Sequence, residues 1–195
     1  GLYGVIRDIT ERKRAEEALR ESETQYRNLA DAGMTLIWRS DVEKSCYYFN
    51  KIWLEFTGRT MAQEIGNGWA QGVHPDDFER CLQTYVSAFD KRERFEMEYR
   101  LRHFSGVYRW ILDLGTPNYN AKGEFVGYIG HCFDITERKQ AELALAESRE
   151  NLAITLNSIG DGVISTDIDG LIVSMNPVAE KLCGYSRTEA AGRPL

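Results

Sequence analysis

The chain has 195 residues, of which 43% are hydrophobic and 28% are charged, so it can bury an ordinary core and is not a disordered tail. Its formal net charge of -6 argues against nucleic acid as the main partner, because phosphate binding needs a clustered basic surface. No apolar run approaches the roughly 20 residues that cross a bilayer, and from these residues we expect no signal peptide.

The four cysteines, Cys46, Cys81, Cys132 and Cys183, include no C-x-x-C pair. This spacing predicts neither a zinc site nor a disulfide framework, and it favours a reducing, cytoplasmic compartment. The chain starts with Gly1 rather than Met. We therefore expect a piece of a longer protein, and membrane spans elsewhere in that protein stay open.

A repeat organises the chain. The segment DITERKRAEEALRES at 8–22 recurs as DITERKQAELALAES at 134–148, with 12 of 15 positions identical. The same offset of 126 relates Asp41 to Asp167, Asn50 to Asn176, Gly58 to Gly184 and Gly66 to Gly192. Such a period exceeds the roughly 20–50 residues of a solenoid unit and matches one small domain plus a connector. The predicted parts are the end of one unit (1–10), a linker helix (11–29), a complete unit (30–136), a second linker helix (137–156) and the truncated opening of a third unit (157–195).

The complete unit is predicted to begin with a β-hairpin. Aromatic and aliphatic runs at 34–40 and 45–49 flank a short polar turn. Helical spacing follows over 51–65 with an interruption at Gly58, and 66–69 is predicted to be a loop.

A longer helix is predicted from the segment His74-Pro75-Asp76-Asp77 as far as Phe89. A histidine beside two acids could also mark a metal or acid–base site. Proline in the first turn and acids near a helix N-terminus explain the same residues as helix initiation, which we favour.

Three strands complete the unit. Residues 94–102 alternate apolar and charged side chains, and a turn at Ser105 leads to a second alternating run at 108–114. Another turn leads to a strand at 125–133. This order predicts an α+β domain, in which helices pack on one face of a five-stranded antiparallel sheet.

The connectors are predicted to be long helices, because no Pro or Gly lies between Glu137 and Ile159, and Thr136 is a candidate N-cap. We favour a two-stranded coiled coil, and hence a homodimer, over a single amphipathic helix that covers its own sheet. The heptad positions hold Arg12, Leu19, Tyr26 and Ala15, Ser22, Leu29 in the first copy, and Arg138, Leu145, Leu152 and Ala141, Ser148 in the second.

Asp134 and Arg138 lie where the last strand enters the second linker. A charge-assisted hydrogen bond between them could fix how the linker leaves the sheet. A surface pair of this kind contributes only ~0.2–1 kcal/mol, which suits a joint that switches. We therefore predict a signal-relay role for Asp134, Thr136, Arg138 and Leu145.

Several motifs together resemble the PAS family of sensor domains with its C-terminal PAC portion. They are Asn50, Phe56-Thr57-Gly58, Trp69 with His74-Pro75-Asp76-Asp77, Tyr99-Arg100-Leu101-Arg102, Gly106-Val107-Tyr108-Arg109-Trp110 and the twice-seen Asp134-Ile135-Thr136-Glu137-Arg138-Lys139. The opening Asp161–Asp167 with Met175-Asn176-Pro177 looks like a further copy. The resemblance covers essentially the whole chain.

This resemblance implies a sensory and relay module of a larger signalling protein, with neighbouring PAS and output domains as partners and no catalysis in this chain. The implied parent is a two-component sensor histidine kinase that starts a phosphorelay. The alternatives are a ligand-free dimerisation scaffold, or the PAS region of a diguanylate cyclase or phosphodiesterase.

The resemblance also implies which cofactors to consider, since PAS domains can bind flavin or haem. A photosensor of the LOV type, which binds FMN, needs a reactive cysteine in the short helix; 61–74 contain none, so we reject it. An oxygen-sensing haem domain needs an axial histidine in the long helix, and 76–91 contain none. His131 in the last strand could point inward, although a packed histidine is the favoured interpretation.

We favour no cofactor, with non-covalent FAD second. The tryptophans could form a flat apolar slot, with Asn50 or His131 as its polar handle, but the same rings could simply fill the core. The candidate pocket residues are Trp38, Asn50, Trp53, Phe56, Trp69, Phe78, Tyr85, Tyr99, Trp110 and His131.

Overall fold

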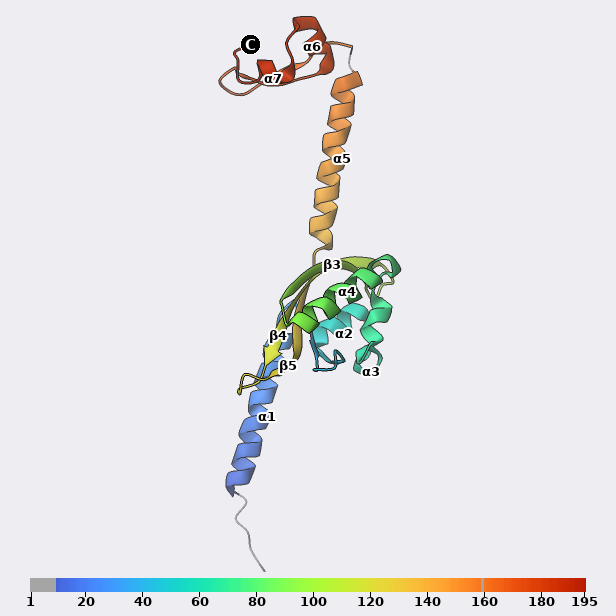
Figure 1. The fold of residues 1–195 in the computed structure, drawn as a ribbon, viewed down its shortest axis with the longest axis vertical. Coiled ribbons are helices and arrows are strands. Elements are labelled where there is room, and N and C mark those ends of the chain that lie inside the picture. Colours follow the sequence, from blue (N-terminus) through green and yellow to red (C-terminus); the bar gives the residue numbers. More distant parts are fainter. Residues whose placement is uncertain (1–9, 159) are drawn as a thin grey trace, which may run out of the picture. The chain divides into compact units, whose positions relative to one another are not determined.

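The computed structural model describes residues 10–158 and 160–195 (Figure 1). They form two compact units, of which the first ends at Glu137 and the second begins at Arg138. The predicted end of a preceding unit lies, apart from Thr10, outside the described residues. Within the described part, no helix combines the length and the apolar character needed to cross a membrane.

The first unit contains one linker helix, a five-stranded sheet and a helical layer. Its helical elements are α1 (Thr10–Asp31), α2 (Lys51–Thr57), α3 (Met61–Glu64), the 3-10 helix η1 (Gly68–Gly72) and α4 (Pro75–Lys91). Its strands are β1 (Leu36–Ser40), β2 (Cys46–Phe49), β3 (Phe95–Arg102), β4 (Tyr108–Tyr119) and β5 (Phe125–Asp134). The segment predicted to be a loop therefore includes the start of η1, which carries Trp69.

The sheet is antiparallel throughout, with the strand order β2-β1-β5-β4-β3. Helices α2, α3 and α4 cover one face of it (Figure 1). The core lies between these two layers and is rich in aromatic side chains. This arrangement confirms the predicted α+β fold.

The alternation in β3 places Phe95, Met97, Tyr99 and Leu101 in the core, as the sequence pattern predicts. In β4 the inward residues are Ile111 and Asp113. The reason is the hairpin register: Tyr99 pairs with Ile111 and Met97 with Asp113, and directly paired residues share a face. Trp110, Leu112 and Leu114 therefore lie on the opposite face of the sheet.

Helix α4 begins as predicted. His74 is its N-cap, and the His74 Nδ1 atom accepts a hydrogen bond from the Asp76 amide at 3.2 Å, with Pro75 as the first helical residue. Asp77 then joins the helix to the sheet, because its carboxylate accepts three hydrogen bonds from Arg100, from Nε at 2.8 Å, from the amide at 3.0 Å and from Nη2 at 3.2 Å. These bonds, first of all the one from the guanidinium, lower the pKa of Asp77 to about 2.

The second unit takes in most of helix α5 (Thr136–Ser158), which starts in the first unit. A hairpin and two short helices follow: β6 (Ile164–Thr166), β7 (Ile172–Met175), α6 (Pro177–Cys183) and α7 (Arg187–Ala190). The buried cluster of this unit is small and consists of Met175, Ala179 and Ala190. The described part of the third repeat is thus a hairpin and helices without the rest of a sheet.

Candidate functional site

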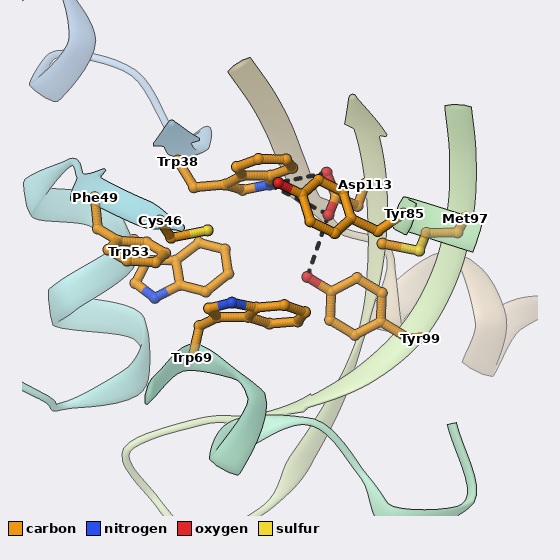
Figure 2. A pocket seen from close by; sticks show the side chains of 9 residues that line it. All are labelled: Trp38, Cys46, Phe49, Trp53, Trp69, Tyr85, Met97, Tyr99 and Asp113. Atoms are coloured by element: carbon orange, nitrogen blue, oxygen red, sulfur yellow. Dashed lines mark hydrogen bonds between the residues drawn. The ribbon is translucent and has the colours of Figure 1, made fainter. Parts of the chain in front are cut away.

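A small cavity lies between the sheet and the helical layer of the first unit (Figure 2). The space open to the centre of a water-sized sphere is about 10 Å³, which is room for one water molecule. Six of the nine lining side chains are aromatic rings and one is a carboxyl group. The nine are Trp38, Cys46, Phe49, Trp53, Trp69, Tyr85, Met97, Tyr99 and Asp113.

The six rings come from six different elements, and two pairs of them contact each other, one edge to face and one tilted. Trp38 and Tyr85 are 5.7 Å apart between ring centroids, and Phe49 and Trp53 are 4.8 Å apart. In Figure 2, Trp38 and Trp69 lie on opposite sides of the cavity. A glycine makes the position of Trp38 possible, because a Cβ atom at Gly130 would stand 2.0 Å from the indole ring.

Asp113 is the charged residue of the cavity wall and is only 2% exposed. Its two carboxylate oxygens accept hydrogen bonds from Trp38 Nε1 at 3.1 and 3.2 Å, and Oδ2 accepts a longer one from the Tyr99 hydroxyl at 3.5 Å. Burial raises the pKa of Asp113 to about 7, although hydrogen bonds with Cys132, Trp38 and Tyr99 oppose the rise. Among the described residues, no cation contributes to this shift.

The cysteine thiols near the cavity are protonated and unreactive at neutral pH. Burial raises the pKa of Cys46 to about 12 and that of Cys81 to about 11, and it raises the pKa of Cys132 well above the usual value. Thiols that stay protonated at neutral pH are poor nucleophiles and poor metal ligands. Over the part of the chain that the structure describes, His, Cys, Asp and Glu form no cluster suited to a metal ion.

Five of the ten predicted pocket residues line the cavity together: Trp38, Trp53, Trp69, Tyr85 and Tyr99. Phe56 and Phe78 are half-buried and pack against the core without lining the cavity. Trp110 is on the opposite face of the sheet, as described above. His131 shares that outer face, because it pairs with Ile37 and Leu114 and alternates with the buried Cys132. Trp110 and His131 are therefore wrong as candidate pocket residues.

Asn50 is also no part of the cavity wall, and the interpretation of Asn50 as a polar handle is wrong. Its Oδ1 atom accepts hydrogen bonds from the amides of Ile37 at 2.9 Å and Trp53 at 3.1 Å. Its Nδ2 atom donates to the carbonyls of Ala30 at 2.8 Å and Thr35 at 2.9 Å. All its hydrogen-bonding capacity thus ties the end of α1 and helix α2 to strand β1.

The residues that sequence reasoning missed are Cys46, Phe49, Met97 and, above all, Asp113. A signal for Asp113 was present. The predicted hairpin turn at Ser105 and the inward phase of Tyr99 fix which residues of the next strand face the core. That register places a carboxylate in the core, where an unpaired charge is uncommon.

The joint between β5 and α5 holds two of the predicted relay residues, Asp134 and Thr136. Asp134 Oδ1 accepts a hydrogen bond from the Thr136 amide at 2.9 Å, and Oδ2 accepts one from Arg109 Nη1 at 3.0 Å. Burial opposes them, yet these bonds from Thr136 and Arg109 hold the pKa of Asp134 below its usual value. The Thr136 side chain is not an N-cap, since helix α5 starts at Thr136 itself.

Two further hydrogen bonds extend the sheet into this joint. The Trp110 amide donates to Thr136 Oγ1 at 2.9 Å, and the Ile135 amide donates to the Trp110 carbonyl at 2.8 Å. Arg138 makes an ion pair with Glu142 at 3.7 Å. The predicted pair between Asp134 and Arg138 stays a prediction, and Leu145 is an exposed residue of α5.

Relatives of this chain include large signalling proteins. The probable diguanylate cyclase DgcE of Escherichia coli is 31% identical over 97% of this chain and 17% of DgcE. The two-component sensor PprA of Pseudomonas aeruginosa is 28% identical over 100% of this chain and 21% of PprA. The uncharacterized protein y4lL of Sinorhizobium fredii is 41% identical over 72% of this chain and 17% of y4lL. The chain therefore spans about a fifth of the length of these relatives.

Solved structures show the same fold. A sensory box histidine kinase/response regulator from Burkholderia thailandensis matches with a TM-score of 0.50 and 29% identity over 64% of this chain and 95% of that chain. The PAS domain of an HTR-like protein from Haloarcula marismortui matches with a TM-score of 0.53 and 20% identity over 63% of this chain and 99% of that chain. Two family models described as the PAS fold match residues 47–132 and 150–195. The chain belongs to the PAS-fold family.

Proposed function

We propose that residues 30–136 are a sensory and relay module of a larger, cytosolic signalling protein. A change in the cavity or at an interface alters strand β5, and helix α5 carries the change to the following unit. Catalysis resides in an output domain beyond residues 1–195, for which a sensor histidine kinase that feeds a phosphorelay is the simplest candidate. The relation to PprA supports this parent, and the relation to DgcE supports a cyclic-di-GMP enzyme as the alternative.

One observation carries the proposal: the cavity and the joint are neighbours on the same pair of strands. Asp113 in the cavity wall pairs across β4 and β5 with Cys132, and Ile111 pairs with Asp134 at the joint. A displacement of β4 at the cavity therefore acts on β5 only two residues before the strand ends. A joint held by a few hydrogen bonds suits a switch whose two states differ little in free energy.

The linker helices support a dimer. Leu19, Tyr26 and Leu29 on α1 are 62%, 72% and 74% exposed in the single chain, and Leu145 and Leu152 on α5 are 54% and 60% exposed. Apolar side chains at heptad spacing favour burial against a second helix. We infer that a second copy of the chain supplies that helix.

The test uses the full-length parent. Leu145→Asp places a charge at a heptad position of α5, whereas Leu143→Asp makes the same substitution on the same helix off the heptad seam. We expect Leu145→Asp and Asp134→Ala to uncouple the output activity from its stimulus while the unit stays folded, and Leu143→Asp to signal normally. Unaltered signalling in both Leu145→Asp and Asp134→Ala would contradict the proposal.

The size of the cavity favours one second candidate, a scaffold that dimerises without a ligand. A space of about 10 Å³ admits one water molecule as it stands. Under this alternative the rings only stabilise the core. Purified protein without any bound small molecule in native mass spectrometry, together with normal signalling in variants of the cavity, would favour the scaffold.

A further inference from the structure

We infer that the cavity accepts a small organic cation, an ammonium group with methyl or short alkyl substituents, which the aromatic rings enclose and Asp113 neutralises. This inference rests on the proposed sensory role of the same cavity and names the chemical class of its ligand.

The walls of the cavity have the composition that attracts such a cation. Tryptophan, tyrosine and phenylalanine rings carry negative charge on their faces, and a cation within about 6 Å of a ring centroid is attracted to it, most strongly when water is excluded. The six rings come from Trp38, Phe49, Trp53, Trp69, Tyr85 and Tyr99. Alkylated ammonium ions lose less hydration on burial than ammonium itself, so they profit most from such walls.

Asp113 supplies the countercharge. Its hydrogen-bond partners, the indole of Trp38, the hydroxyl of Tyr99 and the thiol of Cys132, are neutral donors, so they orient the carboxylate without cancelling its charge. A buried carboxylate without a cationic partner is unfavourable, and a cation in the cavity would relieve this cost. The same charge repels ligands that carry carboxylate or phosphate groups, because burial strengthens the repulsion.

One wall has to move to admit such a ligand. Five of the rings belong to residues that are at most 5% exposed: Trp38, Phe49, Trp53, Tyr85 and Tyr99. Trp69 is half-buried and is carried by η1, a single short 3-10 helix between glycines. Displacement of Trp69 would enlarge the cavity while the carboxylate and the remaining rings stay in place.

Binding should depend on pH through Asp113. The other titratable groups around the cavity keep their protons near neutral pH, because burial raises the pKa of each, and Glu64 is paired with Arg59 at 2.6 Å. A cation binds the ionised form of Asp113, whose pKa is about 7, so affinity should rise about tenfold from pH 6 to pH 8. The groups with raised pKa values are Cys46, Cys81, Tyr85, Tyr99 and Cys132.

The deciding experiment compares two ligands of the same shape on the chain of residues 1–195. Choline carries a trimethylammonium group, and 3,3-dimethylbutan-1-ol has a neutral carbon in place of the nitrogen. Isothermal titration calorimetry at pH 8 should show choline binding at least about tenfold more tightly than the alcohol. Asp113→Asn should remove that preference, and the matched exposed variant Asp90→Asn should retain it.

The comparison of the two ligands needs no variant, so it decides even if Asp113→Asn fails to fold. Equal affinity for choline and the alcohol would overturn the cation and leave a neutral apolar pocket. No binding of choline up to millimolar concentration at pH 8 would also overturn it. Neither result would contradict the proposed relay role, because the signalling assays of Asp134→Ala and Leu145→Asp test that role separately.

Discussion

Asn50 in the central unit and Asn176 in the following one make the same four hydrogen bonds. Asn176 Oδ1 accepts from the amides of Val163 and Ala179, both at 2.9 Å, and its Nδ2 atom donates to the carbonyls of Leu156 at 2.8 Å and Asp161 at 3.0 Å. Each of these partners lies 126 residues after the corresponding partner of Asn50. The residues around this shared anchor differ. Where the central unit has cavity residues, the following unit has Ile164 for Trp38, Ile172 for Cys46, Met175 for Phe49 and Ala179 for Trp53.

This difference separates two tasks. The asparagine joins the end of a linker helix to the first hairpin, and it does so in the same way at both of these junctions. The rings determine what the cavity can hold, and they can differ between units without changing the connection. If this is so, changes to the cavity rings and changes to the asparagine anchor, Asn50 or Asn176, should have separate effects on stability.

The largest effect is expected when the central cavity receives a residue of the following unit. Trp53→Ala introduces the residue found at position 179, and Trp53 is 1% exposed and packs on Phe49. We expect a loss of about 3–5 kcal/mol in the free energy of unfolding, from urea denaturation followed by circular dichroism. Tyr47→Ala, at a position 46% exposed, is the control, with a loss below about 1 kcal/mol. A loss below about 1 kcal/mol for Trp53→Ala would show that the ring is not part of the central core.

The second prediction concerns the anchor. Asn50→Ala removes four hydrogen bonds and should destabilise the central unit by about 3 kcal/mol. Asn176→Ala makes the same change in the following unit and should leave the central unit unaffected. Amide hydrogen exchange of the central strands, measured in both variants, distinguishes the two. Equal loss of protection in both would mean that the units do not unfold independently.

The third prediction follows from Asp113. Its pKa is raised by burial from 3.8 to about 7, so the folded state binds the proton more tightly than the unfolded state. Wild-type stability should therefore fall as pH rises from about 4 to 7. Asp113→Asn removes this dependence, and its stability relative to the wild type should improve by about 2 kcal/mol between pH 5 and pH 8. Parallel pH profiles for the wild type and Asp113→Asn would contradict the assignment, and Asp90→Asn is the control.

The smallest effect is expected for Asp77, whose counterpart would lie beyond Leu195. Its pKa is lowered from 3.8 to about 2 through Arg100, so its contribution is complete above about pH 5 and is lost as pH falls toward 2. Asp77→Asn should cost about 1 kcal/mol at pH 7, since water screens part of the interaction. Urea denaturation should show the variant and the wild type converging near pH 2. A constant gap down to pH 2 would mean that the charge is not the cause.

Most of the fold could be predicted from the sequence, because the elements have strong local signals. The alternation in β3, the proline at the start of α4 and the repeat around Asn50 each indicate structure on their own. The site was predicted less well. Strand β4 carries apolar residues on both faces, so its periodicity does not show which face is buried, and only the pairing with β3 decides it. Trp110 was misplaced and Asp113 was missed for this one reason.

Asn50 was misjudged for a different reason. A buried asparagine after a strand is compatible with a ligand contact and with a helix cap, and both use the same polar atoms. The repeat favours the helix cap, because Asn176 occupies the equivalent position in the following unit, where the aromatic cavity residues are replaced. A residue that stays the same while the cavity residues around it change is better explained by its hydrogen bonds to the backbone than by contact with a ligand.

The joint at Asp134 has a consequence for how such chains are assembled. The hydrogen bonds of Asp134, Thr136 and Trp110 all lie within the first unit, and the segment from Asp134 recurs almost unchanged 126 residues earlier in the sequence. A recombination crossover inside this segment would therefore exchange a whole PAS unit for another. The sequence at both strand-to-helix junctions would stay the same. A chain of this design can acquire a new input by duplication and exchange, while the helical phase of every linker is inherited intact.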